Sequence, residues 1–216
     1  MNRPTARWAK VSLSRFSERP STSLFGAPGQ TFLGIARYMR ALARDEALEG
    51  VVIALRGYSG SWAQAQELRK LIEELQAAGK KVACVLTETN TMGYYVASQA
   101  DTVIADPAGG VWLVGVSSSV LFYRDLLEQV GVDAQAVRVG RYKSFPESFT
   151  RMGPSEDLNV VKEALTEGIY QEIVRGIAKS RDVAEDEVHR WIEEGPYVAT
   201  ELKEQGIVDS VAYADQ

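Results

Sequence analysis

The chain has 216 residues, of which 45% are hydrophobic and 25% charged, and its formal net charge is −5 at pH 7. This length and apolar content are enough for one sizeable buried core. The charge is slightly acidic and evenly mixed, unlike the basic footprint of nucleic-acid-binding proteins, so we expect no nucleic-acid partner.

Neither a membrane span nor a secretory leader is expected from the sequence. It contains no run of 18 apolar residues, which is the usual mark of a spanning helix. The basic start Met1–Lys10 lacks the apolar core of a secretory signal. The chain as given is therefore expected to be soluble. Its one cysteine, Cys84, lies in an apolar run and is expected to be a small core residue rather than a nucleophile.

The first part of the chain predicts helices that alternate with buried strands. Residues 1–28 predict a strand and a loop, because prolines and glycines interrupt them. Apolar side chains recur at helical spacing from Phe32 to about Leu48. The continuously apolar run Val51–Leu55 is typical of a strand buried on both faces. Ser61 and Gln64 form a capping box that opens a further helix, which ends near residue 79.

The middle of the chain continues this alternation. The run Val82–Leu86 predicts a strand that ends in a polar turn at residues 87–90, and a short helix is expected to begin near Thr91. A third strand is expected at Val103–Ala105, broken by the proline and glycines of residues 107–110. A helix near residues 121–130 and a strand near residues 136–139 follow.

The C-terminal part is predicted to be helical. A long helix is expected from Ser155 to about Ser180, and Asp182 with Glu185 is expected to cap another that ends at Gly195. Helices that alternate with buried strands indicate βαβ units and a parallel sheet. The sequence therefore predicts an α/β domain with a helical C-terminal part.

Candidate catalytic groups are few. The single histidine, His189, lies in a charged helical segment and is expected to be solvated, so a Ser-His-Asp triad lacks its base. No set of residues has metal-ligand or cofactor-binding spacing. Lysine can act as a base instead, because burial favours its neutral amine. The candidate is Lys143, which is flanked by a glycine and two aromatic residues; the residues alone leave open a solvated, structural lysine.

Four segments then resemble one known family. The first resembles the segment G-x-Y-K-S-A-x-E-P-F…M-S-P of the signal peptide peptidase A family (protease IV, peptidase family S49). It begins with Gly140–Ser144 (G-R-Y-K-S) and continues with Glu147–Phe149 and Met152–Ser155. Met92–Asp101 is similar to that family's S-G-G-Y-Y-I-A-x-A-A-D. Gly195–Thr200 and the segment 206–209 resemble its C-terminal ending.

The resemblance implies a crotonase/Clp-protease-like βαβ superhelix with a parallel sheet and a helical C-terminal part. It implies one domain over residues 1–216, with a core at about 8–140 and a helical arm and return segment at about 141–216. Lys143 falls on the family's general base, while Thr91 stands at the position of its serine nucleophile. Ser59, Gly60 and Gly93 fall on the oxyanion and substrate segments, of whose S-P-G-G loop only Gly60 is kept.

Because the lysine is kept and the serine is missing, the chain resembles the N-terminal half of the long, two-repeat form of the family. This implies a serine–lysine dyad endopeptidase domain without cofactor or metal, which digests cleaved signal peptides or other extended apolar peptides. The serine would come from a second repeat or a neighbouring subunit in a homo-oligomeric ring. The parent protein would be membrane-associated, on a side that the sequence does not reveal.

Two other classes of function stay open. One is a non-catalytic assembly domain of such a protease, which the replaced serine and the altered oxyanion loop favour. The other is a crotonase-type acyl-thioester enzyme, against which the segment Tyr142–Ser144 argues.

Overall fold

The computed structural model describes residues 7–13 and 31–213. The chain divides into two compact units, one made of Met1–Gly115 with Ile173–Gln216 and the other of Val116–Glu172. Most of the loop expected within residues 1–28 lies outside the described residues. The expectation of a single domain with a boundary near residue 140 stays a prediction.

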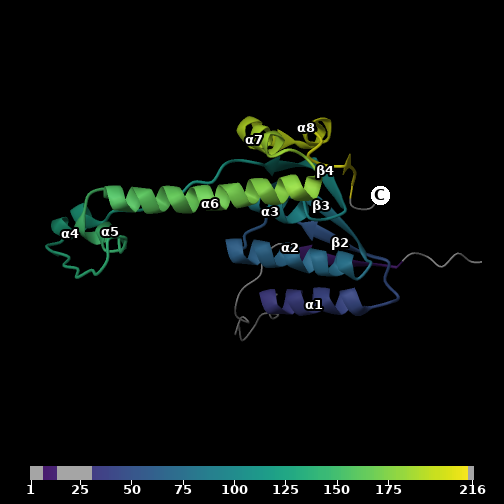
Figure 1. Ribbon diagram of the computed structural model, residues 1–216, viewed down its shortest axis with the longest axis horizontal. Helices are drawn as coiled ribbons and strands as arrows, with labels where there is room; N and C mark the ends of the chain where they lie inside the picture. Colours follow the sequence, from purple (N-terminus) through teal and green to yellow (C-terminus); the bar gives the residue numbers. More distant parts are fainter. Residues whose placement is uncertain (1–6, 14–30, 214–216) are drawn as a thin grey trace, which may run out of the picture. The chain divides into compact units, whose positions relative to one another are not determined.

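A mostly parallel sheet forms the centre of the first unit (Figure 1). Within the described part of the chain it has six strands in the order β1-β2-β3-β4-β5, with β6 paired to β4. All neighbours are parallel except β4 and β5. The strands expected at 51–55, 82–86 and 103–105 are confirmed. The strands are β1 (Trp8–Leu13), β2 (Gly50–Leu55), β3 (Lys81–Asn90), β4 (Thr102–Trp112), β5 (Tyr197–Val198) and β6 (Ser210–Val211).

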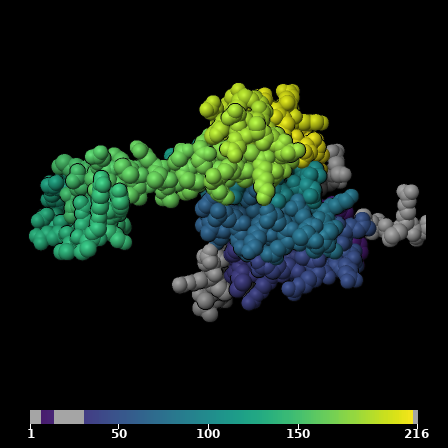
Figure 2. Space-filling view, viewed as in Figure 1, coloured from purple at the N-terminus to yellow at the C-terminus, as the bar shows by residue number. Residues whose placement is uncertain are grey.

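Helices α1 (Phe32–Arg44), α2 (Trp62–Ala77) and α3 (Thr91–Ala97) connect these strands. Helix α2 packs against α1, α3 and β3, and its apolar face is buried. The expected capping box is confirmed, because the Gln64 N–H donates to the Ser61 hydroxyl at 3.3 Å and the Ser61 N–H donates to the Gln64 side chain at 2.8 Å. In the view of Figure 2, side chains of α1 and α2 form much of the visible surface of this unit.

Strands β3 and β4 are longer than the sequence predicts. The expected turn at residues 87–90 is wrong, because β3 continues to Asn90, and the expected break at 107–110 is wrong, because β4 continues to Trp112. The pairing changes register between Leu86 and Glu88, and this irregularity accommodates the proline and glycines. A Cβ on Gly109 would lie 1.8 Å from the Thr87 carbonyl oxygen, so only glycine fits where β4 lies this close to the β3 backbone.

The C-terminal helices of the first unit are the end of α6 (Glu156–Arg181), α7 (Glu185–Glu194) and α8 (Ala199–Glu204). The long helix and the helix after it were both predicted, but the predicted cap is wrong. Helix α7 follows Ala184 without a side-chain cap, and Asp182 has a φ of 54°, in the left-handed region. No helix among the described residues is long and apolar enough to cross a membrane.

The second unit contains α4 (Arg124–Gln129), α5 (Glu147–Thr150) and the first part of α6. The helix expected near 121–130 is confirmed, whereas the strand expected near 136–139 is wrong. Those residues have no strand beside them in the unit, and Val137 is fully exposed. Within residues 116–172 only Ser144, Glu147 and Leu158 are buried.

Candidate active site

The position of the expected nucleophile lies where β3 ends and α3 begins. Asn90 caps α3: its side-chain oxygen accepts the Gly93 N–H at 3.0 Å, and its amide nitrogen donates to the Tyr58 carbonyl at 3.1 Å. Asn90 thereby joins the segment 57–60 to the start of α3. Asn90 was not among the predicted site residues, although asparagine just before a predicted helix is a recognised N-cap signal.

The hydroxyl of Thr91 is engaged by backbone. Thr91 is only 9% exposed. Its hydroxyl lies 2.6 Å from the carbonyl oxygen of Val114 and 3.2 Å from that of Trp112, either of which it can donate to, and it accepts the Val114 N–H at 2.8 Å. A hydroxyl nucleophile needs its proton facing a base and its oxygen facing the substrate. In this arrangement the hydroxyl links α3 to the segment that follows β4.

Gly93 is fixed by close packing. A Cβ at this position would lie 1.9 Å from the Thr89 hydroxyl oxygen and 3.0 Å from the Tyr58 Cβ, so any other residue would force a shift. Among the described residues the buried Thr89 hydroxyl has no hydrogen-bond partner. The Gly93 N–H already donates to Asn90, so it is not available to an oxyanion while that cap is in place.

The segment that replaces the expected oxyanion loop connects β2 to α2. Gly57 has a φ of 61°, which favours glycine, and its N–H donates to the Glu88 carbonyl at 2.7 Å. Tyr58 is buried, and burial raises the pKa of its phenol. Ser59 is exposed and Gly60 is half-buried, just before the helix cap. The first unit thus brings together Tyr58, Asn90, Thr91 and Gly93.

The expected base, Lys143, belongs to the second unit. The Lys143 side chain is exposed. The backbone N–H of Lys143 donates to the Gly140 carbonyl at 3.3 Å. The flanking aromatic residues, Tyr142 and Phe145, are themselves exposed. Among the described residues of this unit, no side chain covers Lys143 from solvent.

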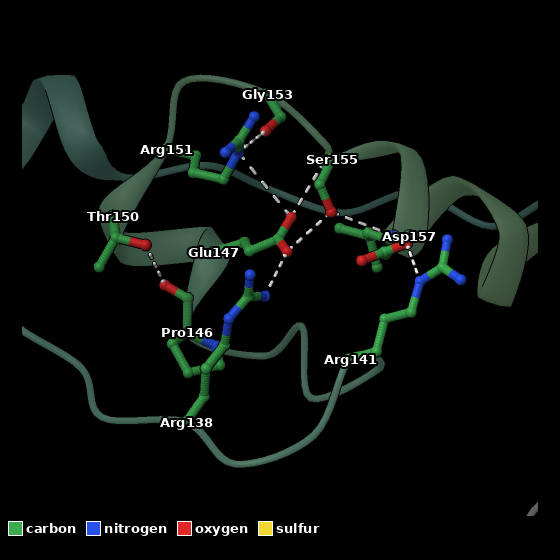
Figure 3. Close-up of polar contacts among 10 residues, drawn as sticks. Arg138, Arg141, Pro146, Glu147, Thr150, Arg151, Gly153, Ser155 and Asp157 are labelled. Carbon is green, nitrogen blue, oxygen red and sulfur yellow. Dashed lines mark hydrogen bonds and ion pairs between the residues drawn. The ribbon is translucent and has the colours of Figure 1, made fainter.

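A buried carboxylate, Glu147, lies four residues after Lys143 (Figure 3). It accepts hydrogen bonds from the Ser155 hydroxyl at 2.8 Å, the Ser155 N–H at 3.0 Å and the Arg138 guanidinium at 3.0 Å. Burial alone would raise the pKa of this carboxyl, but the bonds from Ser155 and Arg138 outweigh it and hold the pKa below its ordinary value. Glu147 belongs to the motif around Lys143, but the sequence predicted no role for it.

Among the described residues, no group of three histidine, cysteine or carboxylate side chains could hold a metal ion. Cys84 is fully buried in β3, and burial raises the pKa of its thiol, which disfavours the reactive thiolate.

A family model described as Peptidase family S49 matches residues 74–216. The chain is 25% identical to the chloroplastic serine protease SPPA of Arabidopsis thaliana, over 81% of this chain and 26% of that protein. It is 26% identical to Protease 4 of Salmonella typhi, over 77% of this chain and 29% of that protein. It is 27% identical to Protease 4 of Haemophilus influenzae, over 80% of this chain and 28% of that protein. The chain therefore spans less than a third of the length of these relatives.

Two solved structures of a membrane-bound stomatin-specific protease share the fold. One aligns with a TM-score of 0.54 at 13% identity, over 98% of this chain and 81% of that chain. The other, in complex with a substrate peptide, aligns with a TM-score of 0.50 at 13% identity, over 95% of this chain and 74% of that chain. Together with the parallel sheet, this likeness confirms the predicted α/β fold of the crotonase/Clp class.

Proposed function

This chain belongs to peptidase family S49, and on that premise we propose that it is the lysine-bearing part of a serine–lysine endopeptidase. Lys143 is the general base, and the serine nucleophile comes from a second repeat or a neighbouring subunit. Thr91 occupies the nucleophile position of this chain without acting as the nucleophile.

One observation carries this proposal. The Thr91 hydroxyl is buried and bonded in both directions to the backbone of Val114. To pass its proton to a base and attack a peptide carbonyl, it would have to give up the bond that it donates, and the Val114 carbonyl would lose this partner. A threonine held in this way supports a structural role, and the chain then needs a nucleophile from elsewhere.

In the proposed reaction the neutral amine of Lys143 accepts the proton of the serine hydroxyl as the serine oxygen attacks the scissile carbonyl. Backbone N–H groups stabilise the oxyanion, and the lysine then returns the proton to the leaving amine. The exposed position of Lys143 in the second unit fits this scheme, because a partner that covers it would favour the neutral amine.

The second unit supports the proposal of a partner. Its 57 residues bury only one apolar side chain, Leu158, while many large apolar side chains are exposed. A unit this small with so little core of its own is expected to need covering surface from elsewhere. We propose that this partner is the serine-bearing repeat or subunit, within a homo-oligomeric ring. The exposed apolar residues include Leu121, Leu126, Val130, Val137, Val139, Phe145, Met152 and Leu165.

The proposed substrates are extended apolar peptides, such as cleaved signal peptides, and the proposed place of action of the parent protein is the membrane surface. Both rest on membership of the family, whose relatives include a putative signal peptide peptidase SppA of Enterococcus faecium. Two differences from the family favour a second candidate function, a non-catalytic assembly domain of the same protease. Threonine replaces serine at position 91, and of the paired glycines in the S-P-G-G loop only Gly60 is kept.

A cleavage assay on the native assembly separates these two functions. The tagged chain is purified from its host together with the proteins bound to it, and hydrolysis of a fluorogenic leucine-rich peptide is followed. Lys143→Ala is expected to lower kcat by about a thousandfold or more, while Lys203→Ala, which removes an exposed lysine of α8, leaves it unchanged. Full activity of the Lys143→Ala assembly would identify the assembly domain instead.

A further inference from the structure

The loop that carries Lys143 is closed at its base by an ion pair. Arg138 and Glu147 lie at the two ends of a ten-residue segment, and the Arg138 guanidinium donates to the Glu147 carboxylate at 3.0 Å. Closing a loop of this length lowers the number of conformations open to every residue within it. Lys143 sits inside this closed segment.

Two tight turns determine the path of the chain within the loop. The Lys143 N–H donates to the Gly140 carbonyl at 3.3 Å, and the Glu147 N–H donates to the Ser144 carbonyl at 2.9 Å. Gly140 has a φ of 100°, a conformation that other residues rarely adopt. The backbone is therefore specified on both sides of the lysine.

The same carboxylate attaches the loop to the first turn of α6. Glu147 accepts the Ser155 N–H at 3.0 Å and its hydroxyl at 2.8 Å, and the Ser155 hydroxyl in turn accepts the Leu158 N–H at 3.1 Å. The Nε atom of Arg151 lies 4.0 Å from the Oε2 atom of Glu147. Figure 3 shows Arg138, Arg151 and Ser155 converging on the carboxylate from three sides.

A carboxylate in this place is costly unless it is fully bonded. Glu147 is 3% exposed, and burying a charge is favourable only when several donors compensate it. A leucine could accept none of these bonds. An amide has one acceptor oxygen, so its NH2 group would face either the Ser155 N–H, or the Arg138 guanidinium and the Ser155 hydroxyl. The charge therefore does more than fill the interior of the loop: it sets the position of three chain segments relative to one another.

We propose that Glu147 is a positioning residue for Lys143, whose carboxylate holds the loop 138–147 against the start of α6 so that the lysine amine is presented in one place. This inference rests on the proposed role of Lys143 as the base. Glu147 does not touch the substrate; it acts through the backbone of the loop.

The test compares Glu147→Gln with Glu163→Gln in the native assembly. Glu163 is an exposed residue of α6 in the same unit, so its replacement makes the same change of charge. Glu147→Gln is expected to lower kcat about 10- to 100-fold with KM changed less than about twofold, because small displacements of a catalytic group cost that much. Glu163→Gln is expected to leave both constants unchanged.

Hydrogen exchange provides a readout that does not depend on activity. In Glu147→Gln the amides of residues 139–147 are expected to exchange at least about tenfold faster, while those of β2 and β3 keep their protection. Ser155→Ala, which removes the hydroxyl and keeps the N–H, is expected to give a smaller change in the same direction. This second variant keeps the test valid if Glu147→Gln does not fold.

The outcomes separate the two claims. If Lys143→Ala leaves cleavage intact, the proposed function is wrong and this inference falls with it. If Lys143→Ala abolishes cleavage while folded Glu147→Gln keeps the wild-type kcat, only the role of Glu147 is wrong. Loss of amide protection throughout the protein in both Glu147→Gln and Ser155→Ala would also overturn the inference, because it would identify Glu147 as a general stabilising residue.

Discussion

Thr91 and Val114 bond to each other in both directions. The threonine hydroxyl lies 2.6 Å from the Val114 carbonyl oxygen, to which it donates, and accepts the Val114 N–H at 2.8 Å. Thr91, which we propose to stand at the nucleophile position, thereby joins the start of α3 to the segment after β4. The chemistry proposed for this chain depends on that assignment.

Thr91→Ala is expected to reduce stability and to spare activity. Loss of the hydroxyl leaves the Val114 N–H and carbonyl without this partner, at a cost of about 0.5 to 1.5 kcal/mol in the free energy of unfolding, because both bonds are only partly buried. Urea denaturation measures this loss, and peptide cleavage by the native assembly should stay within about twofold of the wild type. Thr91→Ser keeps the hydroxyl and should be less destabilising. Abolished cleavage in a folded Thr91→Ala protein would make Thr91 the nucleophile.

Gly93→Ala is expected to destabilise the junction of β3 and α3 by about 1 to 3 kcal/mol, the usual cost of overpacking. The new Cβ would lie 1.9 Å from the Thr89 hydroxyl oxygen. Thr89→Ala removes that atom and should recover part of the loss in the double variant, measured by urea denaturation. Gly168→Ala in α6 is the matched control, because its Cβ meets nothing within 4 Å; it should stabilise the helix by about 0.5 to 1 kcal/mol.

The Arg69 guanidinium ties three helices of the first unit together. It donates to the Tyr95 carbonyl, the Ser98 hydroxyl at 3.0 Å, the Gly176 carbonyl at 2.9 Å and the Ser180 hydroxyl at 2.8 Å. Arg69→Met removes this donor from two buried and two partly buried acceptors and should lower the free energy of unfolding by about 2 to 4 kcal/mol.

The control for this change is Arg37→Met, at an exposed position of α1, which should shift stability by less than about 0.5 kcal/mol. Arg69→Lys keeps the charge but not the planar arrangement of donors, so it should fall between the two. Equal denaturation midpoints for Arg69→Met and Arg37→Met would show that the Arg69 bonds contribute nothing.

Acid is expected to remove the contribution of Glu147 to stability. The pKa of this carboxyl is lowered in the fold from an ordinary value of 4.5, so the unfolded chain binds more protons as the pH falls through this region. The stabilisation is complete above about pH 4.5 and is lost as the pH falls through the lowered folded pKa. Urea denaturation between about pH 7 and pH 3 should show the difference between wild type and Glu147→Gln shrinking on acidification. A difference that stays constant over this range would contradict the linkage.

Much of the fold was predictable because local signals agreed with long-range packing. The capping box at Ser61 lies within its own helix, and the apolar run of β2 has a parallel neighbouring strand on each side. The extension of β4 through Pro107 was not predictable, because its pairing depends on the register shift against β3. The strand expected near Val137 failed for the opposite reason, since an extended apolar segment needs a neighbouring strand in order to pair.

The candidate site was predictable in its residues but not in its contacts. The segment around Lys143 carries a recognisable motif, and the residue type at position 91 already differed from the family's serine. The two bonds from Thr91 to Val114 join residues 23 positions apart, which no local pattern encodes. The burial of Glu147 likewise depends on Arg138 and Ser155, on either side of its own helix.

The most direct test of the central claim is to locate the covalent intermediate. The native assembly is treated with an irreversible, serine-reactive peptide inhibitor, and the modified residue is identified by mass spectrometry of the proteolysed protein. The account predicts an adduct on a serine of the second repeat or the neighbouring subunit, which is absent when Lys143→Ala replaces the wild-type chain. An adduct on the hydroxyl oxygen of Thr91 would contradict it.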